Sequence, residues 1–474
     1  MRIVVVGAGV GGLACAVRLA ASGHAVTLLE QGAAAGGKAG RVELTADGRT
    51  WRFDSGPSLL TMPWVVRELF EETGTPLPAL VPVEPVTRYH FADGSSVALS
   101  ADLAASRASL DAWAPGTGDE WAAFLATCAG MWTASQPFLT GAPPWPPRRP
   151  GPDEAPPDPR DLLRIKPWHT LRTLARAHTR DPRLAMVIER FGTYAGADPR
   201  RAPAALAVAG YVEHAFGAWH APGGIYELVR ALEASFLALG GELRYGAPVT
   251  GVVRGRHRHA GGVRTADGVV EADHVVWNGD ALALARQLDG GRHPRRERSL
   301  SGLALMLAVD GRTPGHVHHE IHFPPSYDAE LDDLFVAPRP VRDPTLYVST
   351  SSMTTPSEAP EDGENWFVLA NAPSGVDADW EAEADRVVER LGVDDRVRAR
   401  QVRSPADLET QTGALGGAIY GDAPHGRLGS IGRPGHRVRG VKNLWRVGGT
   451  AHPGGGLPLV MLGGALVARE IGAA

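Results

Sequence analysis

The chain has 474 residues, 43% of them hydrophobic and 21% charged, and a formal net charge of -5 at pH 7. These values exclude global disorder, predict a globular protein of about two or three domains, and give no reason to expect nucleic acid as a partner. Two cysteines, Cys15 and Cys128, are too few for a disulfide framework or a cysteine-rich metal site.

The longest apolar stretch, residues 3–17, is interrupted by glycines and is shorter than the roughly 18–20 residues that cross a bilayer. One charged residue, Arg2, precedes it, which is weak support for a signal peptide. We therefore expect no membrane-spanning segment and a protein that stays in the cytoplasm. A peripheral association with a membrane is compatible with this expectation.

The first predicted unit is a strand, a glycine loop and a helix. Arg2–Val6 is a β-branched run that predicts a buried parallel strand, and Leu13–Ser22 predicts a helix. Between them, Gly7, Gly9 and Gly12 match the G-x-G-x-x-G pattern of dinucleotide sites. The first glycine allows a tight turn, the second a close approach of backbone to pyrophosphate, and the third close packing of helix on strand.

An acidic residue follows at the spacing that such a site requires. Ala25–Leu29 predicts a second strand, and Glu30, 18 residues after Gly12, is placed to meet a ribose hydroxyl. The helix N-terminus would present free N–H groups to the phosphates. A plain glycine-rich turn is the alternative, but it does not require the strand, the helix and the acid together.

A second glycine loop indicates which dinucleotide is bound. Gly36 and Gly37 follow Glu30 closely, with Lys38 and Arg41 as candidate counter-charges, although a simple turn would also use such a pair. The arrangement resembles the GG-doublet flavoproteins, in which the basic residue after the pair accompanies FAD. In those proteins a loop like Gly56-Pro57 runs near the isoalloxazine ring.

The C-terminus predicts a third strand–loop–helix unit. Asn443–Val447 is strand-like, Leu459–Ile471 is helix-like, and Pro458 suits the first turn of a helix. The end of this helix could face the electron-rich edge of a reduced flavin, whereas a loop that merely closes the fold is the alternative. The candidate cofactor residues in this loop are Gly448, Gly449, Gly456, Leu457 and Pro458.

Nearly the whole chain resembles the bacterial carotenoid desaturases of the phytoene-desaturase type. The matching segments, beyond the N-terminal unit, are GGKAG, FDSGPSLLTMP at Phe53–Pro63, PGG at Pro222–Gly224, PVTGV at Pro248–Val252, HHEIHF at His318–Phe323, DPTLYV at Asp343–Val348, ENWFVLANAP at Glu364–Pro373 and HPGGGLP at His452–Pro458. By this resemblance, Val249 lies on the adenine side of FAD. The triple glycine of the tail is most similar to the 3,4-desaturases of hydroxylated carotenoids.

The resemblance implies an α/β protein with α+β insertions, in a Rossmann-type GG-doublet flavoprotein fold. The FAD domain would be discontinuous, formed by residues 1–80, 220–300 and 415–474. Residues 81–219 and 301–414 would form a substrate and membrane-facing domain of sheet and helices. Strands are predicted at Glu242–Tyr245, Val249–Val253, His274–Val276, Leu346–Ser349 and Trp366–Ala370, and helices at Asp119–Trp132, Ala204–Gly217 and Ile225–Leu239.

The implied activity is FAD-dependent desaturation of a carotenoid, by hydride transfer from an allylic carbon to the flavin and loss of a proton from the neighbouring carbon. The polyene delocalises the cation, so no strong base is needed and no catalytic side chain is selected. The expected reaction is 3,4-desaturation of a hydroxylated or end-modified carotenoid, with oxygen or a quinone as electron acceptor. A phytoene desaturase, a carotenoid isomerase, an amine oxidase and an FAD-free prenyl-lipid-binding chaperone are the alternatives.

One predicted helix suggests contact with a membrane. Along Trp168–Arg180, apolar residues share one face and Arg172, Arg176 and Arg180 share the next, which is typical of an interfacial helix but also of a helix packed in a core. A lipid substrate favours peripheral binding to the cytoplasmic membrane. The proline-rich segment Gly141–Arg160 before it predicts an extended, mobile linker.

A group of histidines is tempting as a metal site. Strand periodicity would place His316, His318 and His322 on one face with Glu320, and His319 on the other. Metal sites need three or four converging ligands, and no cysteine or further acid is near. We therefore expect a packing role for these histidines and no bound metal.

Overall fold

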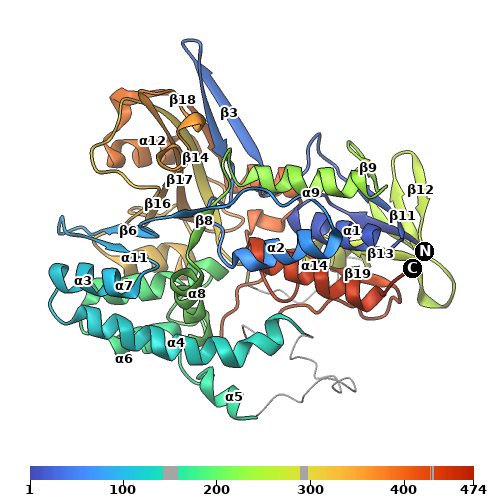
Figure 1. Ribbon diagram of the computed structural model, residues 1–474, viewed down its shortest axis with the longest axis horizontal. Helices are drawn as coiled ribbons and strands as arrows, with labels where there is room; N and C mark the ends of the chain where they lie inside the picture. Colours follow the sequence, from blue (N-terminus) through green and yellow to red (C-terminus); the bar gives the residue numbers. More distant parts are fainter. Residues whose placement is uncertain (142–158, 289–296, 428, 430–431) are drawn as a thin grey trace.

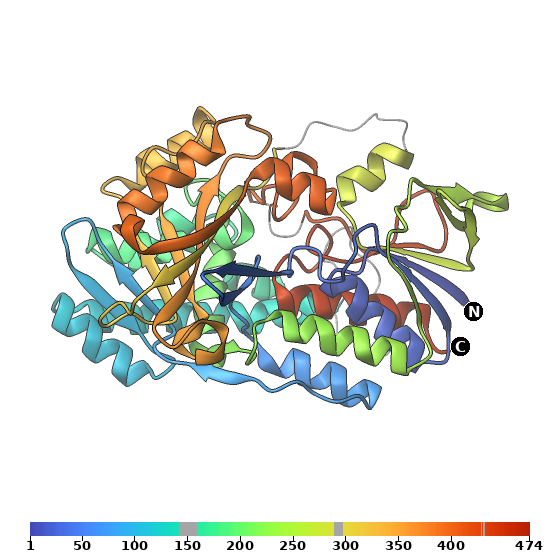
Figure 2. The same cartoon turned by 90° about the horizontal axis from the view of Figure 1, so that it is seen from above.

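A computed structural model of the chain describes residues 1–141, 159–288, 297–427, 429 and 432–474. Two lobes lie side by side, one around a parallel sheet and one around a larger, mostly antiparallel sheet (Figures 1 and 2). The predicted α/β class with α+β insertions is confirmed. Within the described ranges, no helix is long and apolar enough to cross a membrane.

The first sheet is fully parallel, in the order β19-β13-β1-β2-β9. Its strands come from all three predicted segments of the cofactor domain and are β1 (Arg2–Val6), β2 (Ala25–Leu29), β9 (Glu242–Arg244), β13 (His274–Trp277) and β19 (Leu444–Arg446). Residues Ile3–Val5 in the middle strand are buried on both faces, as their unbroken β-branched run requires.

Helices cover one face of this sheet, and a small antiparallel meander and one helix cover the other. The first group is α1 (Val10–Ala21), α2 (Pro63–Thr73), α9 (Tyr226–Ala238) and α14 (Leu457–Ile471), which share one hydrophobic core (Figure 2). The second group is β10 (Gly251–Arg254), β11 (Ala260–Thr265), β12 (Gly268–Glu271) and α10 (Ala281–Leu288). Strand β10 begins at Gly251, two residues after the start of the predicted strand Val249–Val253. Val249 therefore precedes the strand.

The second sheet has the order β18-β14-β17-β16-β15-β6-β7, with a parallel pair only between β15 and β6. Its strands are β6 (Thr87–His90), β7 (Ser96–Leu99), β14 (Ser301–Asp310), β15 (His319–His322), β16 (Leu346–Thr350), β17 (Gly363–Ala372) and β18 (Val397–Arg403). Helix α12 (Trp380–Leu391) packs on one face of its long strands. The hairpin of β3 (Arg41–Ala46) and β4 (Arg49–Asp54) packs on the opposite face of these strands. It follows β2 of the parallel sheet in sequence, but it lies against the second sheet (Figure 1).

A helical layer covers the β6–β7–β15 end of the second sheet. Tyr89, Phe91, Ile321 and Phe323 from that end join its core. The helices of this part are α3 (Leu103–Trp113), α4 (Thr117–Leu139), α5 (Pro159–Arg164), α6 (Leu171–His178), α7 (Pro182–Arg190), α8 (Val208–Phe216) and α11 (Tyr327–Leu331). Strands β5 (Val81–Val83) and β8 (Ala218–His220) form a separate pair, and α13 (Pro405–Thr412) follows β18.

Several helix predictions have shifted bounds, among them two in the helical layer. The predicted helix Asp119–Trp132 extends over the whole of α4, and Ala204–Gly217 is a 3-10 turn at Ala204–Ala207 followed by α8. The proline-rich segment, predicted as a mobile linker, lies for residues 142–158 outside the described part of the chain.

Candidate functional site

The N-terminal glycine loop forms where β1 ends and α1 begins. Gly7 has φ +94°, a conformation that L side chains rarely adopt, and its N–H donates to the carbonyl of Leu29 at 2.7 Å. A Cβ on Gly12 would lie 2.2 Å from the carbonyl oxygen of Gly7, so helix and strand are too close for any side chain. Gly9 is the N-cap of α1, which leaves the N-terminal amides of the helix open to a ligand.

Glu30 lies at the carboxyl end of β2, beside this loop. Its Oε2 accepts a hydrogen bond from the Ala8 N–H at 2.8 Å, and its Oε1 accepts one from the Gly32 N–H at 2.8 Å. The backbone N–H of Ala247 donates to the Glu30 carbonyl at 2.8 Å, which brings the segment before Val249 to the same edge. Glu30 and the segment just before Val249 therefore meet at one end of the loop, although they are far apart in sequence.

The glycine pair Gly36-Gly37 crosses the first loop. The Gly36 N–H donates to the Ala8 carbonyl at 2.9 Å, and a Cβ on Gly37 would lie 3.5 Å from the Cα of Gly9. A Cβ on Gly36 would lie 2.3 Å from the carbonyl oxygen of Ala39, so the turn itself requires glycine. The two glycine loops thus form one cradle.

The two candidate counter-charges have protein partners. The Lys38 ammonium donates to the carbonyls of Ala418 and Ile419, and burial lowers its pKa to about 8. Arg41 forms ion pairs with Glu227 and with Glu43, each at 3.2 Å. Their contacts to a cofactor stay a prediction.

The Gly56-Pro57 loop packs directly against the turn that contains Gly36-Gly37 and Lys38. A Cβ on Gly56 would lie 2.0 Å from the carbonyl oxygen of Lys38, and Arg403, at the end of β18, donates to the Ser55 carbonyl at 2.7 Å. This loop therefore joins the cradle to the second sheet.

The C-terminal loop closes the cradle from the opposite side. A Cβ on Gly11 would lie 3.0 Å from the Cα of Gly448, and Arg433 donates to the Gly449 carbonyl at 3.1 Å. Gly456, with φ +111°, is the N-cap of α14, so the helix begins at Leu457 and Pro458 lies in its first turn. The predicted start at Leu459 was two residues late.

Sequence reasoning missed the residue that links these loops. Asn278 directly follows β13. Its side-chain Nδ2 donates to the carbonyl of Gly7 at 3.0 Å and to that of Gly9 at 3.4 Å. Its Oδ1 lies 2.5 Å from where a Cβ on Gly448 would be. A polar residue at the carboxyl end of a parallel strand, followed by Gly279, is the signal that could have identified it.

The predicted interfacial helix is packed in the protein. Leu171, Leu174 and Ala175 of α6 are buried in the core of the helical layer, and Arg172 pairs with Glu189 and Asp328, each at 2.6 Å. The apolar face of α6 is thus covered by protein, which supports the packed-helix alternative. Trp168, before the helix, is 60% exposed, as is Leu163 of α5 at 58%.

The histidines are predicted to alternate between the two faces of a strand. This alternation does not hold for the residues before His319, because β15 begins only at His319. His316 and His322 do lie with Glu320. His318 instead contacts the rings of His220 and His319, because the residues before the strand do not follow its two-residue period.

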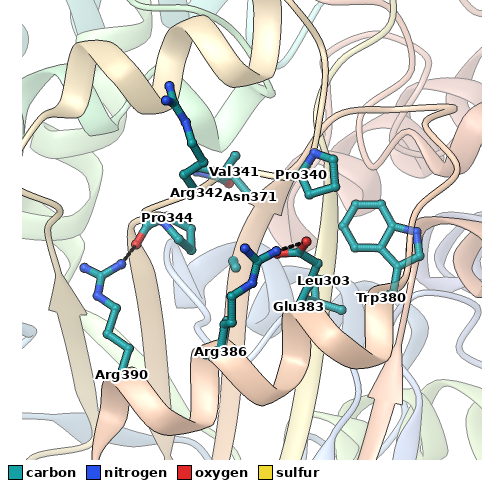
Figure 3. Close-up of a pocket in the computed structure, with 12 residues that line it drawn as sticks. Leu303, Pro340, Val341, Arg342, Pro344, Asn371, Trp380, Glu383, Arg386 and Arg390 are labelled. Carbon is teal, nitrogen blue, oxygen red and sulfur yellow. Dashed lines mark hydrogen bonds and ion pairs between the residues drawn. The ribbon is translucent and has the colours of Figure 1, made fainter.

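The small cavity of about 40 Å³ between α12 and the segment Pro340–Pro344 is lined by none of the predicted cofactor residues (Figure 3). In it, Glu383 pairs with Arg386 on α12, and Arg390 donates to the Pro344 carbonyl. It is therefore separate from the cradle.

Comparison with known proteins agrees with this geometry. Residues 10–305 match the family described as flavin containing amine oxidoreductase. The chain is 34% identical to hydroxyneurosporene desaturase of Cereibacter sphaeroides, over 99% of this chain and 97% of the relative. It is 32% identical to 4,4'-diapolycopene oxygenase of Methylomonas sp (99% and 98%), and 32% identical to the zeta-carotene-forming phytoene desaturase of Myxococcus xanthus (99% and 93%).

Two solved structures share the fold. An oxidoreductase from Methanosarcina mazei has a TM-score of 0.64 at 18% identity, covering 99% of this chain and 100% of that one. RAB GDI from Plasmodium falciparum has a TM-score of 0.53 at 10% identity, covering 85% and 88%.

The chain belongs to the flavin containing amine oxidoreductase family; it is an oxidoreductase, and its cofactor is FAD. Its relatives include carotenoid desaturases, as predicted. The cradle fits FAD because two glycine loops without side chains leave backbone N–H groups and a helix N-terminus free to approach a pyrophosphate, with Glu30 at the adjoining edge.

Proposed function

We propose that this FAD-dependent oxidoreductase introduces a 3,4-type double bond into a carotenoid that is already conjugated and has a hydroxylated or otherwise modified end. Relatives named hydroxyneurosporene desaturase and 1-hydroxycarotenoid 3,4-desaturase support the substrate class. The observation that carries the choice of a modified end is a chain of polar side chains that starts directly after Gly56-Pro57.

This polar chain joins the loop to the second sheet. The hydroxyls of Ser58 and Tyr347 are 2.6 Å apart, and the Tyr347 hydroxyl lies 2.8 Å from Nδ1 of His319. Burial, followed by the nearby His220, lowers the pKa of His319 to about 3, so its ring is neutral near pH 7. When Tyr347 donates to Nδ1, the proton of the ring is on Nε2, and this buried atom has no hydrogen-bond partner in the described ranges.

An unpartnered ring nitrogen, joined to the cofactor loop through Tyr347 and Ser58, favours a substrate that brings an oxygen. An apolar pocket alone distinguishes small groups by only about 1–3 kcal/mol, whereas a site built to hydrogen-bond a hydroxyl rejects an analogue without it much more strongly. An apolar isoprenoid end, as in phytoene, would leave Nε2 of His319 unpaired at a cost of about 1–3 kcal/mol.

When bound, FAD supplies the acceptor of a hydride from an allylic carbon of the polyene. The protein's contribution is to hold the reacting end in place and to exclude water, because the extended conjugation already stabilises the positive charge. The glycines of the tail leave room for the polyene, and Ser58, Tyr347 and His319 orient its polar end. Oxygen or a quinone is proposed as the final electron acceptor.

The decisive experiment supplies the FAD-loaded protein in liposomes with phytoene, with a 1-hydroxylated acyclic carotenoid, or with a cyclic carotenoid, and follows the products by chromatography. We expect a longer chromophore only from a carotenoid that is already conjugated and has a modified end, and none from phytoene. Conversion of phytoene to lycopene with no reaction of the hydroxylated compound would instead establish a phytoene desaturase. A product with changed double-bond geometry and no loss of hydrogen would establish an isomerase.

An FAD-free prenyl-lipid chaperone is the alternative from another class, since a RAB GDI shares the fold. The intact cradle argues against it.

We also propose that the protein binds the surface of the cytoplasmic membrane. The exposed side chains of Leu163 and Trp168, and those of Arg176 and Arg180 further along the chain, support this, rather than the buried face of α6.

A further inference from the structure

A cluster of two histidines and a glutamate lies on one face of the second sheet, outside the FAD cradle. His322 of β15 is paired in register with His90 of β6, and Glu320 lies two residues before His322, so all three side chains share a face. One ligand atom from each lies within 4.8 Å of the other two. The opposite face, with Tyr89 and Ile321, belongs to the core of the helical layer.

The spacing in this cluster is wider than hydrogen bonding requires. The Nε2 atoms of His90 and His322 lie 3.4 and 3.7 Å from the same carboxylate oxygen of Glu320, Oε2. Ordinary N–H···O bonds span about 2.7–3.2 Å. The edge of a tetrahedron around zinc, with ligand bonds of about 2.0–2.1 Å, is about 3.3–3.4 Å. The distances therefore resemble two ligands of one metal ion more than hydrogen bonds.

The two imidazoles are also oriented alike. Their rings are stacked with centroids 4.5 Å apart and planes 8° apart, so both direct Nε2 to the same oxygen. Nε2 of His90 is buried and makes no hydrogen bond to any described residue. It is thus a free ligand atom that faces a buried carboxylate.

A second layer of contacts holds Glu320. Nδ1 of His316 lies 3.0 Å from the same Oε2, and Nε2 of His316 lies 2.7 Å from the Thr350 hydroxyl. Arg88 lies 3.8 Å from the other oxygen, Oε1. Such outer contacts commonly orient the ligands of a metal site.

Access to the cluster is open. His90 and His322 line a cavity of about 380 Å³ together with Asp343 and Arg390. Arg390 donates to the Pro344 carbonyl (Figure 3), and the carboxylate of Asp343 lies 3.8 Å away and partly balances its charge. The side chain of Glu320 is only 5% exposed, whereas those of His90 and His322 are 31% and 30% exposed. An ion could therefore enter on the histidine side, where water can complete its coordination.

We propose that His90, Glu320 and His322 bind one divalent transition-metal ion of the zinc type, with His316 as a positioning residue for Glu320. The mixed nitrogen and oxygen ligands suit zinc or cobalt rather than calcium or magnesium. Because β6 and β15 are far apart in sequence, the ion would fasten the β6–β7 hairpin to the rest of the sheet. The sequence predicts no metal because too few ligands lie near one another along the chain, and His90 joins the cluster only on folding.

The test uses tag-free, chelator-treated protein. Zinc bound after gel filtration is measured by mass spectrometry of the metal, and cobalt binding by the visible spectrum of a tetrahedral ion. We expect one equivalent of metal in the wild type and a higher melting temperature with zinc than without it. His90→Gln and His322→Gln should each weaken binding at least about tenfold, and His316→Gln should weaken it less.

Exposed His169 provides the matched control, and His169→Gln should bind metal as the wild type does. Both cysteines are buried, so they do not offer a competing surface site. Absence of a bound equivalent in the wild type, or unchanged binding in the double variant His90→Gln/His322→Gln, would overturn the proposal. Flavin content is recorded for each variant, and it should not change, because the site lies apart from the cradle.

Discussion

The side-chain amide of Asn278 donates a hydrogen bond to the backbone carbonyl of Gly7 over 3.0 Å. Gly7 follows β1 and Asn278 follows β13, the neighbouring parallel strand. This bond fixes the glycine loop of one strand against the next, and Asn278 also lies against Gly11, Gly12 and Gly448. One amide thus holds the loops from both ends of the chain in register.

Asn278→Leu keeps the approximate volume of the side chain but removes this bond. We expect FAD affinity to fall at least about tenfold and the free energy of unfolding to fall by about 1–3 kcal/mol. Flavin fluorescence titration and denaturant unfolding measure the two effects. Asn371→Ala is the control, because it removes a hydrogen bond to Glu330 in the second sheet and should cost stability but not FAD binding.

Gly12→Ala should abolish flavin binding. The new Cβ would lie 2.2 Å from the Gly7 carbonyl oxygen and force helix and loop apart. A bulky residue at Gly9 should have the same effect through contact with the pyrophosphate. Gly130→Ala in α4 has nothing within 4 Å of its new Cβ, and it should stabilise the helix by about 0.5–1 kcal/mol and leave the protein yellow. A Gly12→Ala protein that still purifies yellow, with bound flavin, would contradict the prediction that this loop binds FAD.

Acid should destabilise the protein through its buried neutral histidines. Burial, with a contribution from His436, lowers the pKa of His452 to about 4 from its usual 6.5. The folded state therefore binds fewer protons than the unfolded state between these values, and stability is lost as pH falls from about 6.5 to 4. His452→Gln can still donate to the Phe138 carbonyl and should flatten this dependence by about 1–3 kcal/mol, measured by denaturant unfolding at a series of pH values.

The membrane proposal predicts that Leu163→Ser/Trp168→Ser weakens binding to anionic vesicles severalfold. Arg176→Glu/Arg180→Glu should weaken it further, with each charge near the surface contributing about 1 kcal/mol. Vesicle sedimentation measures both. The control is Leu237→Ser, which removes an exposed leucine of α9 in the other lobe. Equal sedimentation of all variants would refute binding through this region.

Tyr347→Phe removes the hydroxyl that joins Ser58 to His319. If this chain orients a hydroxylated end, kcat/KM for the 1-hydroxylated carotenoid should fall about tenfold or more, while kcat/KM for a conjugated carotenoid without the hydroxyl should change little. An equal loss on both substrates would show that the tyrosine supports the fold rather than substrate choice.

The residues near the start of the chain determine much of this protein by themselves. A β-branched strand, glycines at fixed spacing, a helix and an acid form one local unit, so Gly7, Gly9, Gly12 and Glu30 could be predicted to lie together. The family, the fold class and FAD are implied by the resemblance of motifs along nearly the whole chain, of which this unit is the first.

Tertiary structure alone decided the rest. Asn278 reaches Gly7, His90 reaches Glu320 and Tyr347 reaches Ser58 across more than 200 residues, through strand order in two sheets. The α6 helix has the same amphipathic pattern whether lipid or protein covers it, and only the packed core shows that protein does. Periodicity reports which face of an element is apolar, but the partner of that face is set by burial and pairing over the whole chain.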